Sequence, residues 1–159
     1  MNGEAILALV VFLLACTAAA TPGLVFRPGD WYRALAKPSW RPPDWLFGPV
    51  WLLLYLSIAV SGWLVWQRAG IDGAALALSI YALQLVLNGL WSVVFFGLRR
   101  PDLAFAEILF LWLSILATIV AFHPVDKTAA YLLVPYALWV TFAAVLNFRV
   151  WRLNPAPAS

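Results

Sequence analysis

The 159-residue sequence has few charged residues, which make up 11% of the chain, and it contains one cysteine and one histidine. A single cysteine cannot form an intrachain disulfide bond. His123 has no cluster of cysteine or carboxylate residues near it in the sequence, and we therefore predict no metal site. A glycine-rich phosphate loop and a serine–histidine–aspartate set are also absent from the sequence. These absences argue against the common classes of soluble enzyme.

Apolar residues fill the sequence instead: 65% of it is hydrophobic, and the mean hydropathy is +0.90. A helix needs about 20 apolar residues to cross the ~30 Å hydrocarbon core of a bilayer. Five runs are long enough, at about residues 5–26, 46–66, 74–96, 103–122 and 129–151. We therefore predict an all-α integral membrane protein, a bundle of five transmembrane helices that forms a single domain over residues 1–159.

The first run contains small residues at 17–21 (TAAAT) that resemble the cleavage site of a secretory signal peptide. A signal peptide begins with basic residues, whereas the only charged side chain before this run is Glu4. For the same reason we do not interpret Cys16 as a lipoprotein anchor. We predict that the first run is a membrane helix.

Basic residues are distributed unevenly between the two ends of the predicted bundle. One end receives the loop at 27–45, the loop at 97–102 and the C-terminus, with Arg27, Arg33, Lys37, Arg41, Arg99, Arg100, Arg149 and Arg152. The other end holds Arg68 and Lys127. Because basic loops tend to stay in the cytoplasm, we predict a cytoplasmic first loop and C-terminus and an external N-terminus. The net charge of +3 then reflects orientation in the lipid bilayer, and we expect no nucleic-acid binding.

Polar and aromatic residues recur at helical spacing in three of the runs. They are Gln84, Asn88, Trp91, Ser92 and Phe95 in the third run, Trp139, Ala143 and Asn147 in the fifth, and Trp51 and Tyr55 in the second. Taken singly, amides in membrane helices often only join neighbouring helices, and tryptophans often mark the membrane interface. Because amides and tryptophans coincide on one face of two helices, we favour a shared pocket over these structural interpretations.

Glu107 is the only acidic residue inside a predicted span, and it lies about one turn beyond Pro101 and Asp102. An acidic residue within the membrane suggests a proton relay. Its position near the basic end of the bundle also suggests an ion pair with Arg99 or Arg100, and we favour the ion pair.

Two backbone features of the runs carry further expectations. Pro135 lies inside the fifth run, four residues before Trp139, where it should kink the helix and free a backbone carbonyl. Ala15, Ala19 and Gly23 are spaced by four residues in the first run, a small-residue pattern that allows close helix contact. On this pattern we expect a homodimer.

Four segments of the sequence resemble those of one known family. They are Lys37–Pro43 (KPSWRPP), Gln84–Phe96 (QLVLNGLWSVVFF), Val134–Trp139 (VPYALW) and Ala143–Asn154 (AAVLNFRVWRLN). In this order they are similar to segments of the translocator protein (TspO/MBR) family, whose members are also called tryptophan-rich sensory proteins or peripheral benzodiazepine receptors. The resemblance covers nearly the whole chain and is to a bacterial member.

The resemblance implies a five-helix bundle, usually dimeric, with one apolar cavity that the first loop caps. Such a cavity binds tetrapyrroles such as protoporphyrin IX, sterols and benzodiazepine-type drugs, and it requires no cofactor. The pocket positions that the resemblance implies here are Tyr32, Trp40, Pro43, Trp51, Asn88, Trp91, Trp139, Ala143, Leu146 and Asn147.

The family's sterol-recognition segment near the C-terminus is matched here by Val145, Phe148 and Arg152. The strict pattern has tyrosine where this sequence has Phe148, so the hydroxyl group is missing and the expectation of sterol binding is weaker. Arg149 also departs from the family, because mammalian members have another aromatic residue there.

Three functions compete. The resemblance favours a receptor, sensor or transporter that binds a tetrapyrrole between tryptophans. The alternative is an enzyme that degrades porphyrins with light and oxygen, with Trp51 and Trp139 as redox-active side chains. A proton-coupled exporter that depends on Glu107 ranks third.

The first loop contains Lys37–Trp45 (KPSWRPPDW), a segment with more proline and tryptophan than a solvated linker needs. Pro38, Pro42 and Pro43 restrict the backbone, and Trp40 lies between them as an apolar side chain. We predict that this segment is a semi-rigid lid over the cavity.

Overall fold

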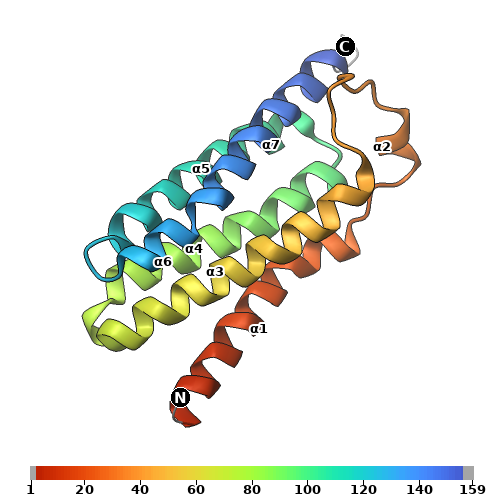
Figure 1. Cartoon of the computed structure of the whole chain (residues 1–159). Coiled ribbons are helices and arrows are strands. Elements are labelled where there is room, and N and C mark those ends of the chain that lie inside the picture. The colour runs from red at the N-terminus through yellow and green to blue at the C-terminus, as the bar shows by residue number, and fades with distance from the viewer. Residues whose placement is uncertain (1–2, 156–159) are drawn as a thin grey trace.

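The computed structural model describes residues 3–155, so the single domain predicted over residues 1–159 extends beyond the described part at both ends. The described residues form helices and no strand (Figure 1). These are α1 (Gly3–Val25), α2 (Asp30–Ala34), α3 (Asp44–Gly73), α4 (Ala75–Ser92), the π-helix η1 (Val93–Gly97), α5 (Pro101–Phe122), α6 (Lys127–Leu132) and α7 (Val134–Leu153). The prediction of an all-α protein is confirmed.

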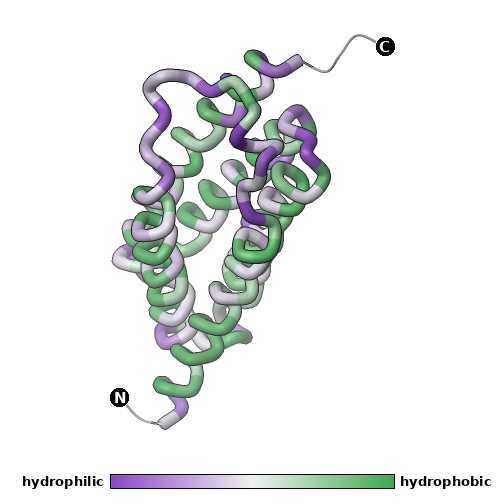
Figure 2. Tube along the Cα trace, turned by 90° about the vertical axis from the view of Figure 1, so that its right-hand side faces the viewer, coloured by the Kyte–Doolittle hydropathy of each residue, from purple (hydrophilic) through white to green (hydrophobic). Residues whose placement is uncertain are grey.

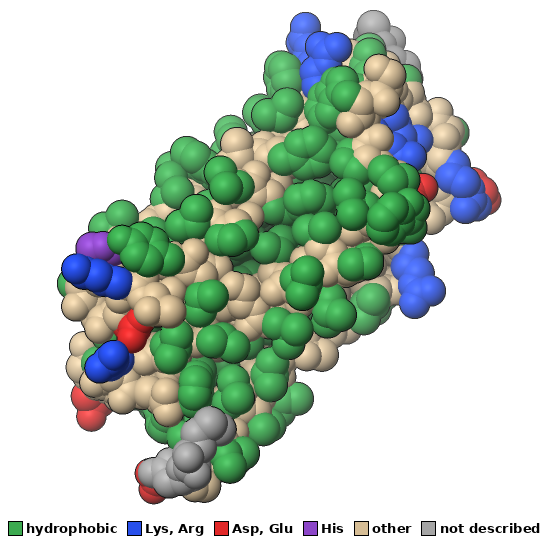
Figure 3. Space-filling view, viewed as in Figure 1, with side chains coloured by type: hydrophobic (Ala, Val, Ile, Leu, Met, Phe, Trp, Pro, Cys, Tyr) green, Lys and Arg blue, Asp and Glu red, His purple; other side chains and the backbone are tan. Residues whose placement is uncertain are grey.

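Five of these segments are long and apolar enough to cross a membrane: α1, α3, α4 with η1, α5, and α6 with α7. Hydrophobic residues follow the helices in Figure 2, and hydrophilic residues lie mainly at the two ends of the bundle. Figure 3 shows the same division on the surface, where Lys, Arg, Asp and Glu side chains gather toward the ends. The chain is therefore an integral, multi-pass membrane protein. The cytoplasmic placement of the first loop and C-terminus stays a prediction.

The second span is longer than expected. The residues at 67–73, expected as a connection, continue α3 as far as Gly73. The helix is interrupted only at Gly70, whose φ of 66° and ψ of −173° suit a residue without a Cβ atom. Polar residues such as Gln67 and Arg68 ended the apolar run, but they remain compatible with a helix that extends beyond the hydrocarbon core.

Asp126 joins the far end of α3 to the start of α6. Its carboxylate accepts hydrogen bonds from the Ala129 N–H at 2.9 Å and from Nε of Arg68 at 3.1 Å. These bonds favour the charged form, the Ala129 bond most strongly, and they lower the pKa of Asp126 below its ordinary value. Asp126 thus caps α6 and holds it against α3.

The expected kink at Pro135 is instead a break before it. Leu133 separates α6 from α7, and Pro135 falls in the first turn of α7, where its missing N–H breaks no helical hydrogen bond. The carbonyl of Leu132, beside the break, accepts a hydrogen bond from Oγ of Ser57 at 2.7 Å. The Leu132 carbonyl therefore joins α6 to α3.

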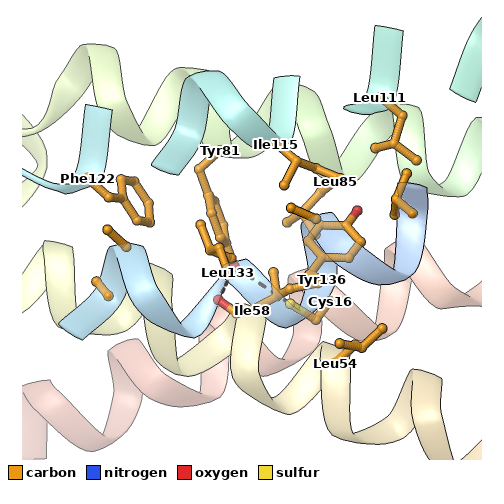
Figure 4. Close-up of a cluster of buried hydrophobic side chains, with 14 of the residues drawn as sticks. Cys16, Leu54, Ile58, Tyr81, Leu85, Leu111, Ile115, Phe122, Leu133 and Tyr136 are labelled. Carbon is orange, nitrogen blue, oxygen red and sulfur yellow. Dashed lines mark hydrogen bonds between the residues drawn. The ribbon is translucent and has the colours of Figure 1, made fainter. Parts of the chain in front are cut away.

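Helix α4 packs against both α1 and α5, and α5 packs in turn against α7. The buried core between them includes Tyr81, whose ring stacks on Phe122 at 5.7 Å between centroids (Figure 4). The Tyr81 hydroxyl donates to the carbonyl of Ile58 at 3.1 Å. In lipid, close packing and interhelical hydrogen bonds of this kind hold helices together, because lipid tails are as apolar as the core.

The small residues of α1 pack inside the chain. A Cβ atom added to Gly89 of α4 would lie 3.1 Å from the carbonyl oxygen of Ala19, and one added to Gly23 would lie 3.4 Å from Oγ of Ser92. The pattern therefore explains how closely α1 approaches α4, and it gives no support for a dimer interface. The homodimer stays a prediction.

Candidate functional site

Aromatic side chains from α3 and α7 meet in one cluster near the first loop. The Trp139 ring lies 5.7 Å from Phe47 and 5.5 Å from Phe142, between ring centroids. Trp51, one turn beyond Phe47 on α3, lies 6.3 Å from Tyr136 of α7. We call these five residues the aromatic cluster. It brings together Trp51 and Trp139, two of the predicted pocket tryptophans.

A chain of hydrogen bonds joins this cluster to α4. The Tyr55 hydroxyl donates to Oδ1 of Asn88 at 2.5 Å, and Nδ2 of Asn88 donates to the Tyr136 hydroxyl at 2.7 Å. The Tyr136 hydroxyl then donates to Oε1 of Gln84 at 3.1 Å. Asn88 and Tyr136 are buried, so these bonds replace water and join α3, α4 and α7. Asn88 therefore acts as an interhelical connector, which is the structural interpretation that the sequence pattern favours less than a pocket.

Asn147 makes a similar connection closer to the first loop. Its Oδ1 accepts from Nε1 of Trp91 at 3.0 Å, and its Nδ2 donates to the carbonyl of Pro101 at 2.7 Å. The Trp91 ring stacks on Phe95 at 5.0 Å. Leu146 is buried in the same group, against which Phe47 and Phe142 also pack. The two groups of side chains are therefore continuous, and the predicted residues of α3, α4 and α7 lie in one region.

Four buried side-chain polar atoms among the described residues have no hydrogen-bond partner: Nε1 of Trp139, Nε2 of Gln84, and both carboxylate oxygens of Glu107. A buried polar group without a partner costs about 1–3 kcal/mol. Trp139 is notable because its unpaired donor belongs to the aromatic cluster. A tryptophan indole can only donate, so a bound molecule would have to present an acceptor to it.

The ion pair expected at Glu107 is wrong. The carboxylate of Glu107 is buried with no partner, and Arg100 instead pairs with Asp102 at 2.6 Å. Leu111 and Ser114, at i+4 and i+7 from Glu107, are buried too. This spacing shows that Glu107 belongs to the inward face of α5, and it was readable from the sequence.

The predicted loop residues lie over the cluster or beside it. Trp40 is 46% exposed, and its ring lies 5.9 Å from Phe142. The Tyr32 ring packs on Phe96 at 5.5 Å, and its hydroxyl accepts from Nη1 of Arg41 at 3.2 Å. Pro43 is exposed and precedes the first residue of α3.

Two polar contacts hold the loop in place. Nζ of Lys37 lies 4.6 Å above the Tyr32 ring, and partial burial lowers the pKa of this ammonium group. Asn154, just beyond α7, accepts from the Ala36 N–H and donates to the Ala36 carbonyl, both at 2.9 Å. The first loop is therefore fastened to the end of the last helix.

The residues of the sterol segment lie on another face. Val145 is 51% exposed and Phe148 is 38% exposed. Together with residues of α5 they line a groove of about 380 Å³, whose walls are Phe105, Leu109, Trp112, Thr141, Ala144, Val145 and Phe148. Arg152 is exposed one turn beyond Phe148. This segment therefore faces outward between α5 and α7, away from the aromatic cluster.

Three members of the aromatic cluster were not predicted: Phe47, Tyr136 and Phe142. Each lies three or four residues from a predicted tryptophan on the same helix, so helical spacing could have identified them. Tyr136 matters most, because it is fully buried and carries the central hydroxyl of the hydrogen-bond chain.

Comparison with known proteins agrees with this arrangement. The model of the TspO/MBR family matches residues 5–152, which include all five spans apart from their outermost residues. The chain belongs to the TspO/MBR family. It is 44% identical over 146 residues to the protein CrtK of Rhodobacter capsulatus, covering 91% of each chain. It is 40% identical over 148 residues to the human translocator protein, covering 90% of this chain and 88% of the human one.

A tryptophan-rich sensory protein of Cereibacter sphaeroides is 43% identical over 145 residues, covering 91% of this chain and 90% of its own. These names support a role for this TspO/MBR member as a membrane receptor or sensor. The aromatic cluster and its hydrogen-bond chain lie within the matched region.

Proposed function

We propose that this protein is a receptor or transporter that binds a tetrapyrrole, such as protoporphyrin IX, at the aromatic cluster. The unpaired Nε1 of Trp139 carries the proposal, because it is a buried donor with no acceptor in the protein. A carboxylate on a flat macrocycle would supply that acceptor, while the rings of Trp51 and Phe47 would contact its apolar face.

Binding at the cluster requires the lid to move. Neither the outer groove at Val145 nor a second cavity beside Arg27 opens between Trp51 and Trp139. Trp40 covers Phe142 from the loop side, and Asn154 holds the loop through Ala36. A ligand would therefore enter when the loop leaves α7, and the proposed lid would close over it.

Replacing Trp139 with phenylalanine is expected to weaken protoporphyrin binding by about tenfold to a hundredfold. The substitution removes the indole donor and keeps an aromatic ring, and a hydrogen bond to a charged acceptor contributes about 1.5–3 kcal/mol. The measurement is a titration of the detergent-solubilised protein with protoporphyrin, followed by porphyrin absorbance and tryptophan quenching. Trp45→Phe is the matched control, because Trp45 is 71% exposed near the same loop. An absence of saturable binding to the wild type at micromolar ligand would refute the tetrapyrrole proposal.

The same sample distinguishes a receptor from an enzyme. Under illumination in oxygen, a receptor either retains the absorbance of its bound porphyrin or loses the absorbance of at most one porphyrin per protein. Several turnovers per protein, abolished in both Trp51→Phe and Trp139→Phe, would establish the porphyrin-degrading alternative. Among the described residues there is no group of three or more His, Cys, Asp or Glu side chains that could hold a metal, and the proposal requires no cofactor.

Sterols are a second ligand class, which the outer groove favours. The groove is almost entirely apolar and is lined by Val145 and Phe148, and Thr141 already accepts a hydrogen bond from Trp112 at 2.8 Å. A sterol there would depend mainly on apolar contact. A tetrapyrrole and a sterol would then bind at separate sites without competing.

A further inference from the structure

A second cavity lies beneath the start of the first loop. It has a volume of about 250 Å³ and is lined by Arg27, Gly29, Asp30, Trp31, Phe96 and Arg99. They come from the segment between α1 and α2, from the start of α2, and from η1 and the turn just beyond it, at the end of the bundle where α2 lies (Figure 1). Unlike the outer groove, this cavity is walled by charged side chains.

Two arginines of the cavity lack an acidic partner. Among residues 3–155, Arg33, Arg41, Arg68 and Arg100 form ion pairs, whereas Arg27 and Arg99 form none. Nε of Arg27 donates to the carbonyl of Leu24 at 2.9 Å, which leaves the outer nitrogens of the guanidinium group free. The cavity therefore presents unused donors from two separate parts of the chain.

Asp30 also lines the cavity, and its negative charge is already matched. Its carboxylate accepts from Arg33 at 2.5 Å, and this bond lowers the pKa of Asp30. The Asp30 side chain is 98% exposed and therefore well hydrated. With Asp30 and Arg33 balanced, the charge left at the cavity is that of Arg27 and Arg99.

The backbone at Arg99 is held in an unfavourable conformation. Its φ of 56° is the only positive φ of a non-glycine residue in the described chain. The bonds from the Leu98 N–H to the Val93 carbonyl at 2.8 Å, and from the Arg100 N–H to the Val94 carbonyl at 3.2 Å, hold this turn at the end of η1. Strained turns and π-helical segments are concentrated at functional sites. A glycine at position 99 would adopt this φ without strain, so the presence of arginine there is consistent with a role for its side chain.

The residue types that line the cavity are typical of the membrane interface. Trp31 packs edge-on against Phe95 at 6.0 Å between ring centroids, which holds this wall of the cavity in place. Tryptophan and arginine together at the ends of membrane spans face the headgroup layer, where phosphates and carboxylates of amphiphiles are concentrated. Guanidinium groups bind such oxyanions with paired hydrogen bonds.

We propose that this cavity binds an oxyanion of a membrane amphiphile, held between the guanidinium groups of Arg27 and Arg99. A phospholipid phosphate and a tetrapyrrole carboxylate share this chemistry. The inference does not depend on ligand binding at the aromatic cluster, because it uses no residue of that cluster.

The test compares binding of short-chain phosphatidylglycerol with phosphatidylcholine of the same chain length, by native mass spectrometry in a nonionic detergent. The variants are Arg27→Gln and Arg99→Asn, singly and together, since asparagine tolerates a positive φ. Arg149→Gln is the matched control, because Arg149 is exposed, is predicted to lie at the same end and forms no ion pair among the described residues. Arg99→Lys keeps the charge and should keep most of the binding.

We expect the wild type to prefer phosphatidylglycerol about tenfold, and the double variant to lose that preference while Arg149→Gln retains it. A parallel titration with protoporphyrin identifies the source: loss of lipid binding alone assigns the site to a phosphate headgroup, and loss of porphyrin binding alone assigns it to a carboxylate. Wild-type affinity for both probes in a folded double variant would overturn the proposal. An equal loss in Arg149→Gln would also overturn it, because the effect would then be general surface charge.

Discussion

Replacing Gly62 with valine is expected to lower the melting temperature of the detergent-solubilised protein by about 10 °C. A Cβ atom at Gly62 would lie 2.8 Å from ring atoms of both Phe12 in α1 and Tyr81 in α4. Neither contact can be relieved by a small shift, because three helices meet there, and overpacking of this kind costs about 3 kcal/mol. For a chain of this length, each kcal/mol corresponds to about 2–4 °C. Circular dichroism during heating would measure the change.

Two further variants test whether the contacts at Gly62 cause the loss of stability. Leu53→Val introduces the same branched side chain on α3 at a position that is 67% exposed, and it should change the melting temperature little. Adding Phe12→Ala to Gly62→Val removes one of the two contacts and should restore part of the lost stability. If Gly62→Val melts like the wild type, α1 does not approach α3 and α4 as closely as the structure shows.

Replacing Glu107 with leucine is expected to raise the melting temperature by about 5 °C. Both carboxylate oxygens of Glu107 are buried without a partner, and the surrounding face of α5 includes Ala104, Ile108 and Leu111. Leucine removes the unpaired polar atoms and adds apolar contact in a site of similar volume, which is worth about 1–3 kcal/mol. Thermal melts of the purified variant and of the wild type would measure the difference in melting temperature.

Glu107→Gln is the matched control for this prediction. Glutamine keeps the length and polarity of the side chain, so its amide atoms would remain unpaired and the gain should be small. A lower melting temperature in Glu107→Leu would contradict the prediction and would mean that Glu107 is bonded to water or to a bound molecule. That outcome would return Glu107 to consideration as a functional residue.

The fold was largely predictable because the bilayer imposes a simple length rule. All five apolar runs became spans. What sequence reasoning missed depended on local backbone geometry. The positive φ at Arg99 and the π-helix before it have no signal in the hydropathy pattern, and the break at Leu133 lies two residues before Pro135.

The candidate site was partly predictable, because helical periodicity shows which side chains share a face. Helical spacing identified Trp139 and Asn88 as inward-facing, because a stripe of side chains follows directly from 3.6 residues per turn. Spacing cannot show which partner each group meets. Asn88 bonds to two tyrosines, whereas the Trp139 indole bonds to nothing, and only the packing of α3, α4 and α7 distinguishes the two. The ion pair expected for Glu107 failed for the same reason.

The contact between Asn154 and Ala36 has a practical consequence for handling the protein. One side-chain amide, a few residues from the C-terminus, makes both bonds that fasten the first loop to α7. An affinity tag or fusion partner placed at the C-terminus would be attached close to that amide. The rate of ligand release measured on such a protein would then reflect the effect of the tag as well as the motion of the loop. The N-terminus lies at the other end of the bundle (Figure 1), which makes it the better place for any attachment.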